Sequence, residues 1–155
     1  MSNRLKPIRI YIENSVIGGY FDIEFLEPTR RLFELFNRGI FLPVISTHVE
    51  AELAKGAPDQ VKNLLKLLNY EKIELSDEVR YLVEKYMEQE IVSENFRDDT
   101  IHVAVATVSG VDILVSWNFR HIVNFQKIRK FNAVNMSEGY QILDIRSPKE
   151  VIEYV

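Results

Sequence analysis

The chain has 155 residues, a formal net charge of −4 at pH 7 and no cysteine. This length predicts a single domain with its own core, and the absence of cysteine excludes disulfides, thiolate catalysis and Cys-ligated zinc. The negative charge disfavours bulk electrostatic binding of nucleic acid, but a nuclease stays possible because a metal bound to carboxylates restores positive charge locally.

The first predicted element is a buried strand over residues 8–12, which ends abruptly at Glu13. Asn14 or Ser15 is placed to cap a short helix over residues 15–21. In an open parallel sheet, ligands bind where strands end. Glu13 is therefore the first candidate site residue, and its alternative is a polar residue that merely ends a strand.

Strands and helices alternate along the rest of the chain. Further strands are predicted at residues 41–45, 73–75, 112–116, 133–135 and 142–145. Helices are predicted from Pro28 to Gly39, from Thr47 to Gly56, over 61–68, from Ser76 to Met87, from Asp98 or Asp99 to Gly110, and after the capping box Ser147–Glu150. This alternation predicts an α/β fold with a parallel sheet and helices on both faces.

Two acidic residues lie early in the helix that follows the second strand. Glu50 is the third residue after Thr47, so it is explained as a capping-box partner. Glu52 faces about 200° away from Glu50 and borders the apolar face, where an unpaired carboxylate is costly. A functional role and a structural role for Glu52 both stay open.

A second group of polar residues surrounds the strand at 112–116. Asp98 and Asp99 both suit the start of a helix, and Asp99 shares a face with His102. His102 lies in an apolar helix, which favours a hydrogen-bonded core or supporting residue over a metal ligand. Asn118 follows the strand end, as Glu13 follows the first one.

Oxygen donors at several strand ends and helix starts predict a site for a hard cation, Mg²⁺ or Mn²⁺. The three histidines show no paired spacing such as i, i+4, which disfavours zinc. Such a metal activates water for attack on a phosphodiester. The segment Arg120–Lys130 is basic, with Phe119 and Phe125 nearby. It is interpreted either as a guide for a nucleic-acid backbone or as an ordinary solvated face.

Four stretches in this order resemble the PIN-domain family, in particular the VapC-like toxins of toxin–antitoxin pairs. The stretches are IYIENSVI at 10–17, ISTHVEAEL at 45–53, DDTIHVAVA at 98–106 and ILVSWNFRHI at 113–122. The resemblance implies one PIN-like domain over 1–155, with a parallel sheet between helices. It further implies a Mg²⁺- or Mn²⁺-dependent endoribonuclease that is the toxin of a type II pair, with an RNA substrate and a cognate antitoxin.

Matched motif by motif, the family's acidic positions fall at Glu13, Glu52, Asp99 and Asn118, and the resemblance implies that Glu13 and Asp99 hold the metal. Two departures accompany this match. Glu13 stands where the family has aspartate, and its additional methylene extends the carboxylate by roughly 1.5 Å. Asn118 keeps an oxygen but has no charge. The alternative is therefore a catalytically degenerate PIN fold that binds RNA or protein.

Two further expectations concern the setting of the chain. No apolar run approaches the roughly 18–20 residues of a membrane span, and the polar start from Met1 to Pro7 lacks an apolar stretch behind it, so a cytoplasmic protein without membrane contact is predicted. The apolar positions at 29–38 and 60–68 are expected either to supply a homodimer interface or simply to face the core.

Overall fold

A computed structural model describes residues 6–153 and 155, so most of the polar N-terminal stretch expected from Met1 onward lies outside the described residues. At its centre is a five-stranded sheet in the order β3-β2-β1-β4-β5. Every pair of neighbouring strands is parallel. The predicted α/β class is therefore confirmed.

The strands are β1 (Ile8–Ile12), β2 (Phe41–Ser46), β3 (Glu71–Ile73), β4 (Ile113–Val115) and β5 (Asp144–Arg146). The helices are α1 (Asn14–Gly19), α2 (Leu26–Asn37), α3 (Thr47–Gly56), α4 (Asp59–Leu67), α5 (Asp77–Glu88), the 3-10 turn η1 (Glu94–Phe96), α6 (Arg97–Ser109), α7 (Phe125–Ser137) and α8 (Pro148–Ile152).

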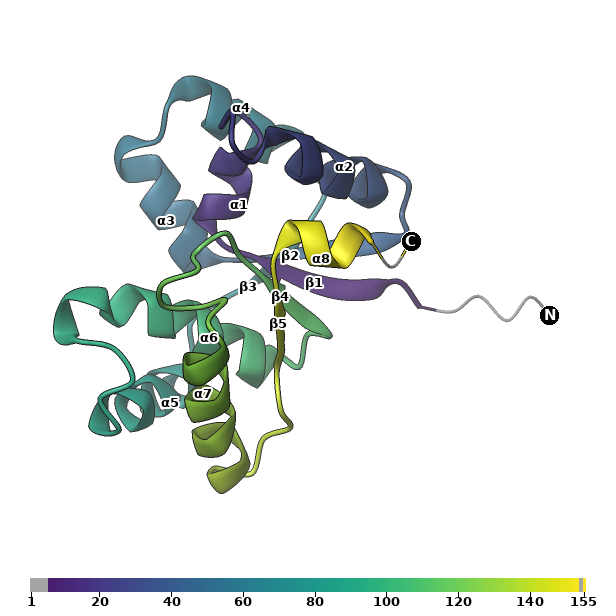
Figure 1. Ribbon diagram of the computed structural model, residues 1–155. Coiled ribbons are helices and arrows are strands. Elements are labelled where there is room, and N and C mark those ends of the chain that lie inside the picture. The colour runs from purple at the N-terminus through teal and green to yellow at the C-terminus, as the bar shows by residue number, and fades with distance from the viewer. Residues whose placement is uncertain (1–5, 154) are drawn as a thin grey trace.

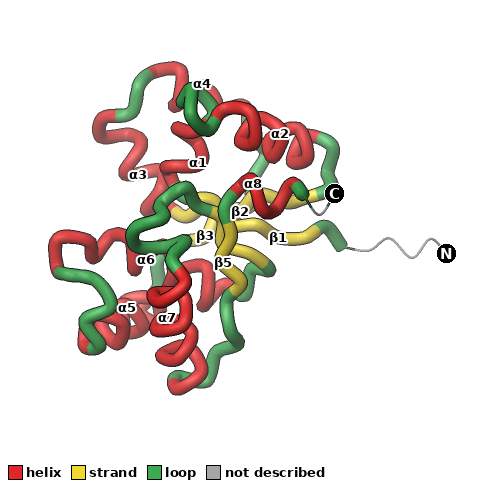
Figure 2. The backbone as a smooth tube through the Cα atoms, viewed as in Figure 1, coloured by secondary structure: helices red, strands yellow, loops and turns green. Residues whose placement is uncertain are grey.

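The sheet lies between two layers of helices (Figures 1 and 2). One layer holds α1 to α4 together with α8, and the other holds α5, α6 and α7. Both faces of the central strands are therefore covered, which explains why β1 and β2 consist mainly of buried apolar residues rather than an alternating pattern. Within the described residues, no helix has both the length and the apolar character that crossing a bilayer requires.

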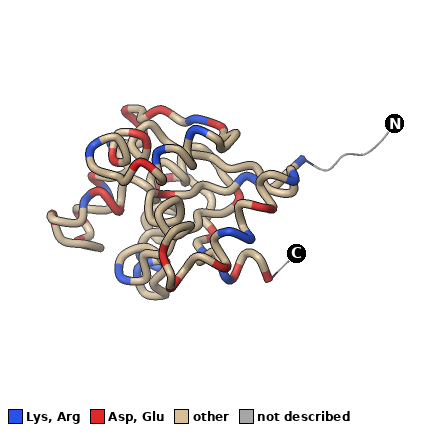
Figure 3. Tube along the Cα trace, turned by 90° about the horizontal axis from the view of Figure 1, so that it is seen from above, with Lys and Arg blue, Asp and Glu red and all other residues tan. Residues whose placement is uncertain are grey.

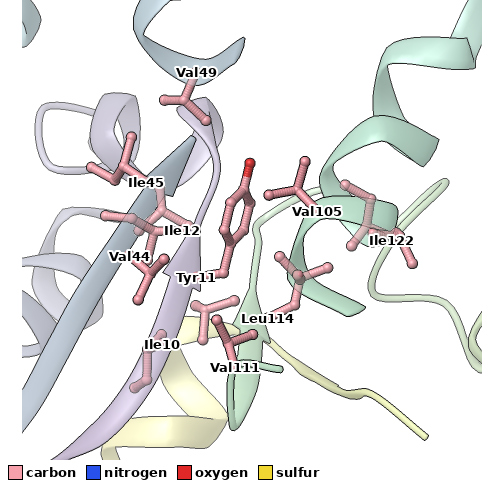
Figure 4. Close-up of a cluster of buried hydrophobic side chains, with 14 of the residues drawn as sticks. Ile10, Tyr11, Ile12, Val44, Ile45, Val49, Val105, Val111, Leu114 and Ile122 are labelled. Carbon is pink, nitrogen blue, oxygen red and sulfur yellow. The ribbon is translucent and has the colours of Figure 1, made fainter. Parts of the chain in front are cut away.

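Tyr11 of β1 brings a polar hydroxyl group into the apolar core. Tyr11 is fully buried among Ile10, Ile12 and Leu114. Its ring stands in this cluster with the hydroxyl directed toward the end where Val49 lies (Figure 4). A buried phenol needs a hydrogen-bond partner, and this orientation places the Tyr11 hydroxyl at the C-terminal end of the sheet.

Several caps match the sequence pattern and two do not. Ser76, Gly110 and the Ser147–Glu150 capping box act as expected. The first helix, however, is capped by Glu13, whose side chain accepts the Ser15 N–H, and not by Asn14 or Ser15.

The second capping prediction is also wrong. Helix α3 is capped by Ser46, one residue before Thr47. Glu50 instead accepts a hydrogen bond from the Tyr70 hydroxyl and pairs with Lys72 on β3. It ties α3 to the edge of the sheet.

The predicted strand at 133–135 is wrong, because these residues belong to α7. Asn135 is fully buried there and accepts a hydrogen bond from the Tyr86 hydroxyl. A polar residue therefore occupies a core-facing position of α7, so the apolar residues alone do not show the helical period. The short strands predicted at 73–75 and 142–145 exist, shifted to β3 and β5.

Candidate functional site

The four predicted site residues all come from elements that meet at the C-terminal edge of the sheet. Glu13 follows β1, Glu52 lies on the helix that follows β2, and Asn118 follows β4. Helix α6 leads into β4 at the opposite edge, so its first turn, with Asp99, starts back at this edge. The sheet reverses its strand order beside β1, where open α/β sheets place their ligands.

Glu13 is almost fully buried, and its carboxylate joins the ends of β1 and β4. Its Oε2 accepts the Ser15 N–H at 3.1 Å, and its Oε1 accepts the hydroxyls of Ser15 and, at 3.0 Å, Ser116. Burial raises the pKa of Glu13, although the charge of His102 and these hydrogen bonds lower it. Of the roughly four lone-pair positions of a carboxylate, one on Oε2 stays open.

The two serines continue this network into the chain that leaves β4. The Trp117 N–H donates to Ser15 Oγ at 3.0 Å, and the Asn118 N–H donates to Ser116 Oγ at 2.9 Å. Each hydroxyl thus accepts from the backbone and donates to Glu13. The loop that presents Asn118 is positioned by the same carboxylate that caps α1.

His102 lies at the centre of the acidic group. It is buried, and its Nδ1 is 2.8 Å from the Tyr11 hydroxyl, which is also 2.8 Å from Ser46 Oγ. The charge of His102 lowers the pKa of Glu13, of Glu52 and of Asp99, in each case against burial, which raises it. Three carboxylates from three separate elements therefore share one imidazole as electrostatic neighbour.

Glu52 contacts two histidines directly. His102 Nε2 lies 2.9 Å from Glu52 Oε1, and His48 Nε2 lies 3.4 Å from the same oxygen. Burial raises the pKa of Glu52, but the contact with His102 and the charges of His102 and His48 outweigh it, so the pKa lies below its usual range. Glu52 therefore stays ionised at neutral pH.

Asp99 and Asn118 form the outer part of the group. Asp99 is half-buried, and burial raises its pKa, with the neighbouring Glu52 charge acting in the same direction. His121, His102 and a hydrogen bond from Asn118 act against this rise. The Asn118 oxygen accepts the backbone N–H groups of Arg120 and His121, so it stabilises the loop.

The basic segment after Asn118 is partly engaged within the molecule. The Arg120 guanidinium lies over the Phe96 ring at 5.0 Å, and Lys127 donates to the Ile91 carbonyl at 2.8 Å. Acidic and basic residues are interspersed along the trace (Figure 3). Phe119, Phe125 and Arg129 are exposed, so both interpretations of this segment stay open.

His48 and Tyr11 were missed by the sequence reasoning. His48 is four residues before Glu52, the spacing that places two side chains on one helix face, so a His–Glu search rather than a His–His search would have found it. Tyr11 gave no signal, because an aromatic residue in a buried strand is ordinary. His102, expected as a supporting residue, lies within hydrogen-bond distance of Tyr11 and also faces Glu52 directly.

Comparison with known proteins supports the fold and nothing finer. No protein-family model matches the chain, and no curated protein matches it. A chain in the crystal structure of VapBC2 from Rickettsia felis, bound to a DNA fragment from their promoter, has a similar structure, with a TM-score of 0.61. The similarity covers 90% of this chain and 98% of that chain at 16% sequence identity.

This likeness confirms the fold that the PIN-domain resemblance implied. The protein has a PIN-like α/β fold, with a parallel sheet sandwiched by helices and acidic side chains at the C-terminal edge of the sheet. At 16% identity the likeness concerns the fold alone.

Proposed function

We propose that this protein is a divalent-metal-dependent endoribonuclease, the toxin of a type II toxin–antitoxin pair. The observation that carries the proposal is the arrangement around His102 at the edge of a PIN-like sheet: its Nε2 lies 2.9 Å from Glu52 Oε1, and its charge lowers the pKa of Glu13, Glu52 and Asp99. Clustered carboxylates at such an edge suit metal-assisted attack on a phosphodiester.

Carboxylate oxygens are the donors that Mg²⁺ and Mn²⁺ prefer. Asp99 and Glu52 raise each other's energy as like charges in a half-buried setting, and a cation would relieve that repulsion. Asp99 is the main proposed ligand, and Glu13 would add its remaining Oε2 lone pair. When bound, the cation supplies water activation and charge neutralisation on the phosphate.

The chain's own residues have distinct proposed roles. Glu52, ionised at neutral pH, accepts a hydrogen bond from the attacking water and orients it. Asn118 holds Asp99 through its amide. Glu13 fixes the ends of β1 and β4, so that these groups keep their relative positions.

The test compares the same substitution at two neighbouring aspartates, Asp99 and Asp98. Asp99→Asn removes the proposed ligand charge while keeping its shape, and it should lower Mn²⁺-dependent cleavage of single-stranded RNA by at least about 10³-fold, several kcal/mol of transition-state stabilisation. Asp98→Asn changes an exposed carboxylate one position earlier and should change cleavage less than about threefold. Equal rates for both variants would refute the assignment of Asp99.

A degenerate, non-cleaving PIN fold is the second candidate, and two observations favour it. The Glu13 carboxylate already accepts three hydrogen bonds, and the Asn118 oxygen is occupied by its own loop. This function predicts RNA or protein binding without cleavage. Wild-type protein that binds no Mn²⁺ and cuts no RNA would favour this candidate over the nuclease.

The proposed partner is a cognate antitoxin protein, by analogy with the VapBC2 complex. A small reading frame next to the gene, whose product copurifies with this chain, would support it. A homodimer has weaker support, because Leu32, Phe33, Leu35 and Phe36 of α2 face the core. Leu67 of α4 is exposed and leaves that helix as a possible interface. Sedimentation that shows only an 18 kDa species would remove the dimer, and a cytoplasmic location stays a prediction.

A further inference from the structure

We propose that His48, Glu52 and His102 form a distinct site for a transition-metal ion, which binds Zn²⁺, Co²⁺ or Ni²⁺ in preference to Mg²⁺. The site adjoins the proposed nuclease site through Glu52, but it does not depend on nuclease activity. It differs from that site in its donors, two imidazole nitrogens and one carboxylate oxygen.

The spacing of the three donor atoms suits a small cation. Ligands at about 2.0–2.1 Å from a metal lie about 2.9 Å apart in adjacent octahedral positions and about 3.4 Å apart in tetrahedral ones. Glu52 Oε1 lies 2.9 Å from His102 Nε2 and 3.4 Å from His48 Nε2. All three donor atoms lie within 4.8 Å of one another.

Two of these atoms have unmet bonding capacity. His48 Nε2 and Glu52 Oε1 are buried, and neither has a hydrogen-bond partner within residues 6–153 and 155. The histidine contacts of Glu52 are ion-pair distances without hydrogen-bond geometry. Buried polar atoms without partners are uncommon in native proteins and call for an explanation such as an ion.

The surroundings of His102 match those of a metal-binding imidazole. Such a histidine usually donates its other ring N–H to an oxygen that fixes the ring orientation. His102 Nδ1 faces the Tyr11 hydroxyl at 2.8 Å, and that hydroxyl is fixed in turn by Ser46 Oγ. The ring is thereby held with Nε2 toward Glu52 and His48.

Rigid elements supply all three donors. His48 and Glu52 are one turn apart on α3, and His102 lies on α6 from the opposite helical layer. A donor set of two histidines and one glutamate leaves a coordination position open for water, as in catalytic zinc sites. Nitrogen donors favour borderline transition metals, whereas Mg²⁺ prefers oxygen donors alone.

The experiment titrates Co²⁺ into the untagged full-length protein at pH 7.5 in excess Mg²⁺ and follows the visible absorption of bound Co²⁺. Wild type should saturate at a single equivalent. His48→Gln, at a partly buried position, should weaken binding by more than about 100-fold, since it removes a ligand rather than a supporting hydrogen bond. Tyr11→Phe keeps the ring and removes only its hydroxyl, and should weaken binding by about 10- to 100-fold.

Two variants act as controls. His121→Gln removes a histidine outside the triad and should bind Co²⁺ as wild type does. Asp99→Asn should also bind Co²⁺ normally even if it loses RNA cleavage, which separates this site from the nuclease proposal. Urea unfolding of every variant shows that each one is folded.

The proposal is overturned if wild type binds no Co²⁺, if Mg²⁺ displaces Co²⁺ at comparable concentration, or if His48→Gln binds as tightly as wild type. Loss of Co²⁺ binding in Asp99→Asn would place the ion in the acidic site instead and would also overturn it. Loss confined to His48→Gln and Tyr11→Phe supports it.

Discussion

The two sides of the acidic group differ in how fully their polar atoms are satisfied. On the strand side, the buried Glu13 carboxylate accepts hydrogen bonds from Ser15 and Ser116. On the helix side, Glu52 Oε1 and His48 Nε2 are buried without such partners among the described residues. One side is closed by the protein itself, and the other has the donors for an added cation.

This contrast shows that residue type and position at a strand end do not define a ligand. Glu13 and Glu52 are both glutamates at one sheet edge, and both feel the charge of His102. Their hydrogen bonds differ, and so their expected contributions differ: Glu13 is expected to contribute mainly to stability, and Glu52 to the proposed binding and chemistry. Substitutions at the two positions should therefore separate stability from function.

The largest expected effect is on stability at Glu13. Glu13→Ala leaves the part-buried N–H and hydroxyl of Ser15 and the buried hydroxyl of Ser116 without their acceptor, and should lower the free energy of unfolding by about 3 kcal/mol. Glu52→Ala, at a half-buried carboxylate, should lower it by less than about 1 kcal/mol. Urea unfolding at pH 7.5 measures both. Similar losses for the two variants would break the contrast.

A neighbouring pair of glycines tests how tightly the strand side is packed. A Cβ at Gly19 would lie 2.9 Å from the Trp117 ring and 3.0 Å from Thr29 Oγ1, whereas a Cβ at Gly18 meets nothing within 4 Å. Gly19→Ala should therefore destabilise the protein by about 2 kcal/mol. Gly18→Ala should stabilise it by about 0.5–1 kcal/mol, because alanine is the better helix former. Thermal unfolding compares them, and a neutral Gly19→Ala would show that Trp117 moves freely.

Glu13→Asp tests the strand side further, because it shortens the side chain by one methylene and keeps the carboxylate. A shorter carboxylate still suits the cap of α1 and brings the charge closer to the position that a small octahedral cation requires. Mn²⁺-dependent RNA cleavage should rise by about tenfold, within the roughly 10²-fold range of a 1 Å displacement. The measurement is initial rate against Mn²⁺ concentration. Reduced cleavage would mean that the backbone is adapted to glutamate.

The smallest expected effect is a pH dependence of stability from His121. Its ring nitrogens are buried without hydrogen-bond partners in the described part of the chain, and burial lowers its pKa, which Asp99 partly offsets. Below the ordinary pKa of about 6.5 the unfolded chain takes up a proton before the folded chain does. Stability from this group is thus complete above that pH and is lost as the pH falls. The free energy of unfolding should decline less between pH 7.5 and 5.5 in His121→Gln than in wild type, and identical slopes would contradict this.

The fold was predictable because its main signals are local. Continuous apolar strands, the caps Ser76 and Ser147, and the positive-φ glycines Gly39 and Gly110 each depend on a few consecutive residues. The misassigned strand at 133–135 depended instead on a distant partner: Asn135 reads as polar, yet it is buried against Tyr86, 49 residues earlier in the chain.

The sequence predicted that four polar residues lie at one edge of the sheet, but not their contacts, and it missed His48 and Tyr11. Chain order placed Glu13, Glu52, Asp99 and Asn118 at one edge of the sheet. Glu13 accepts hydrogen bonds from Ser15 and from Ser116. The bond from Ser116 cannot be predicted from the local sequence, because the two residues are 103 positions apart. The imidazoles that face Glu52 join two helices from opposite layers, so only the folded structure brings them together.

The hydrogen bond between Glu13 and Ser116 spans 103 residues, and β1 can pair with β4 only after α1 to α6 have been formed or bypassed. Contacts this distant in sequence carry a large loop-closure entropy and slow folding. The edge that holds the candidate site is therefore expected to assemble late, after the local helices and the β1–β2 pair. On a growing chain this edge cannot exist until residues beyond 116 have left the ribosome.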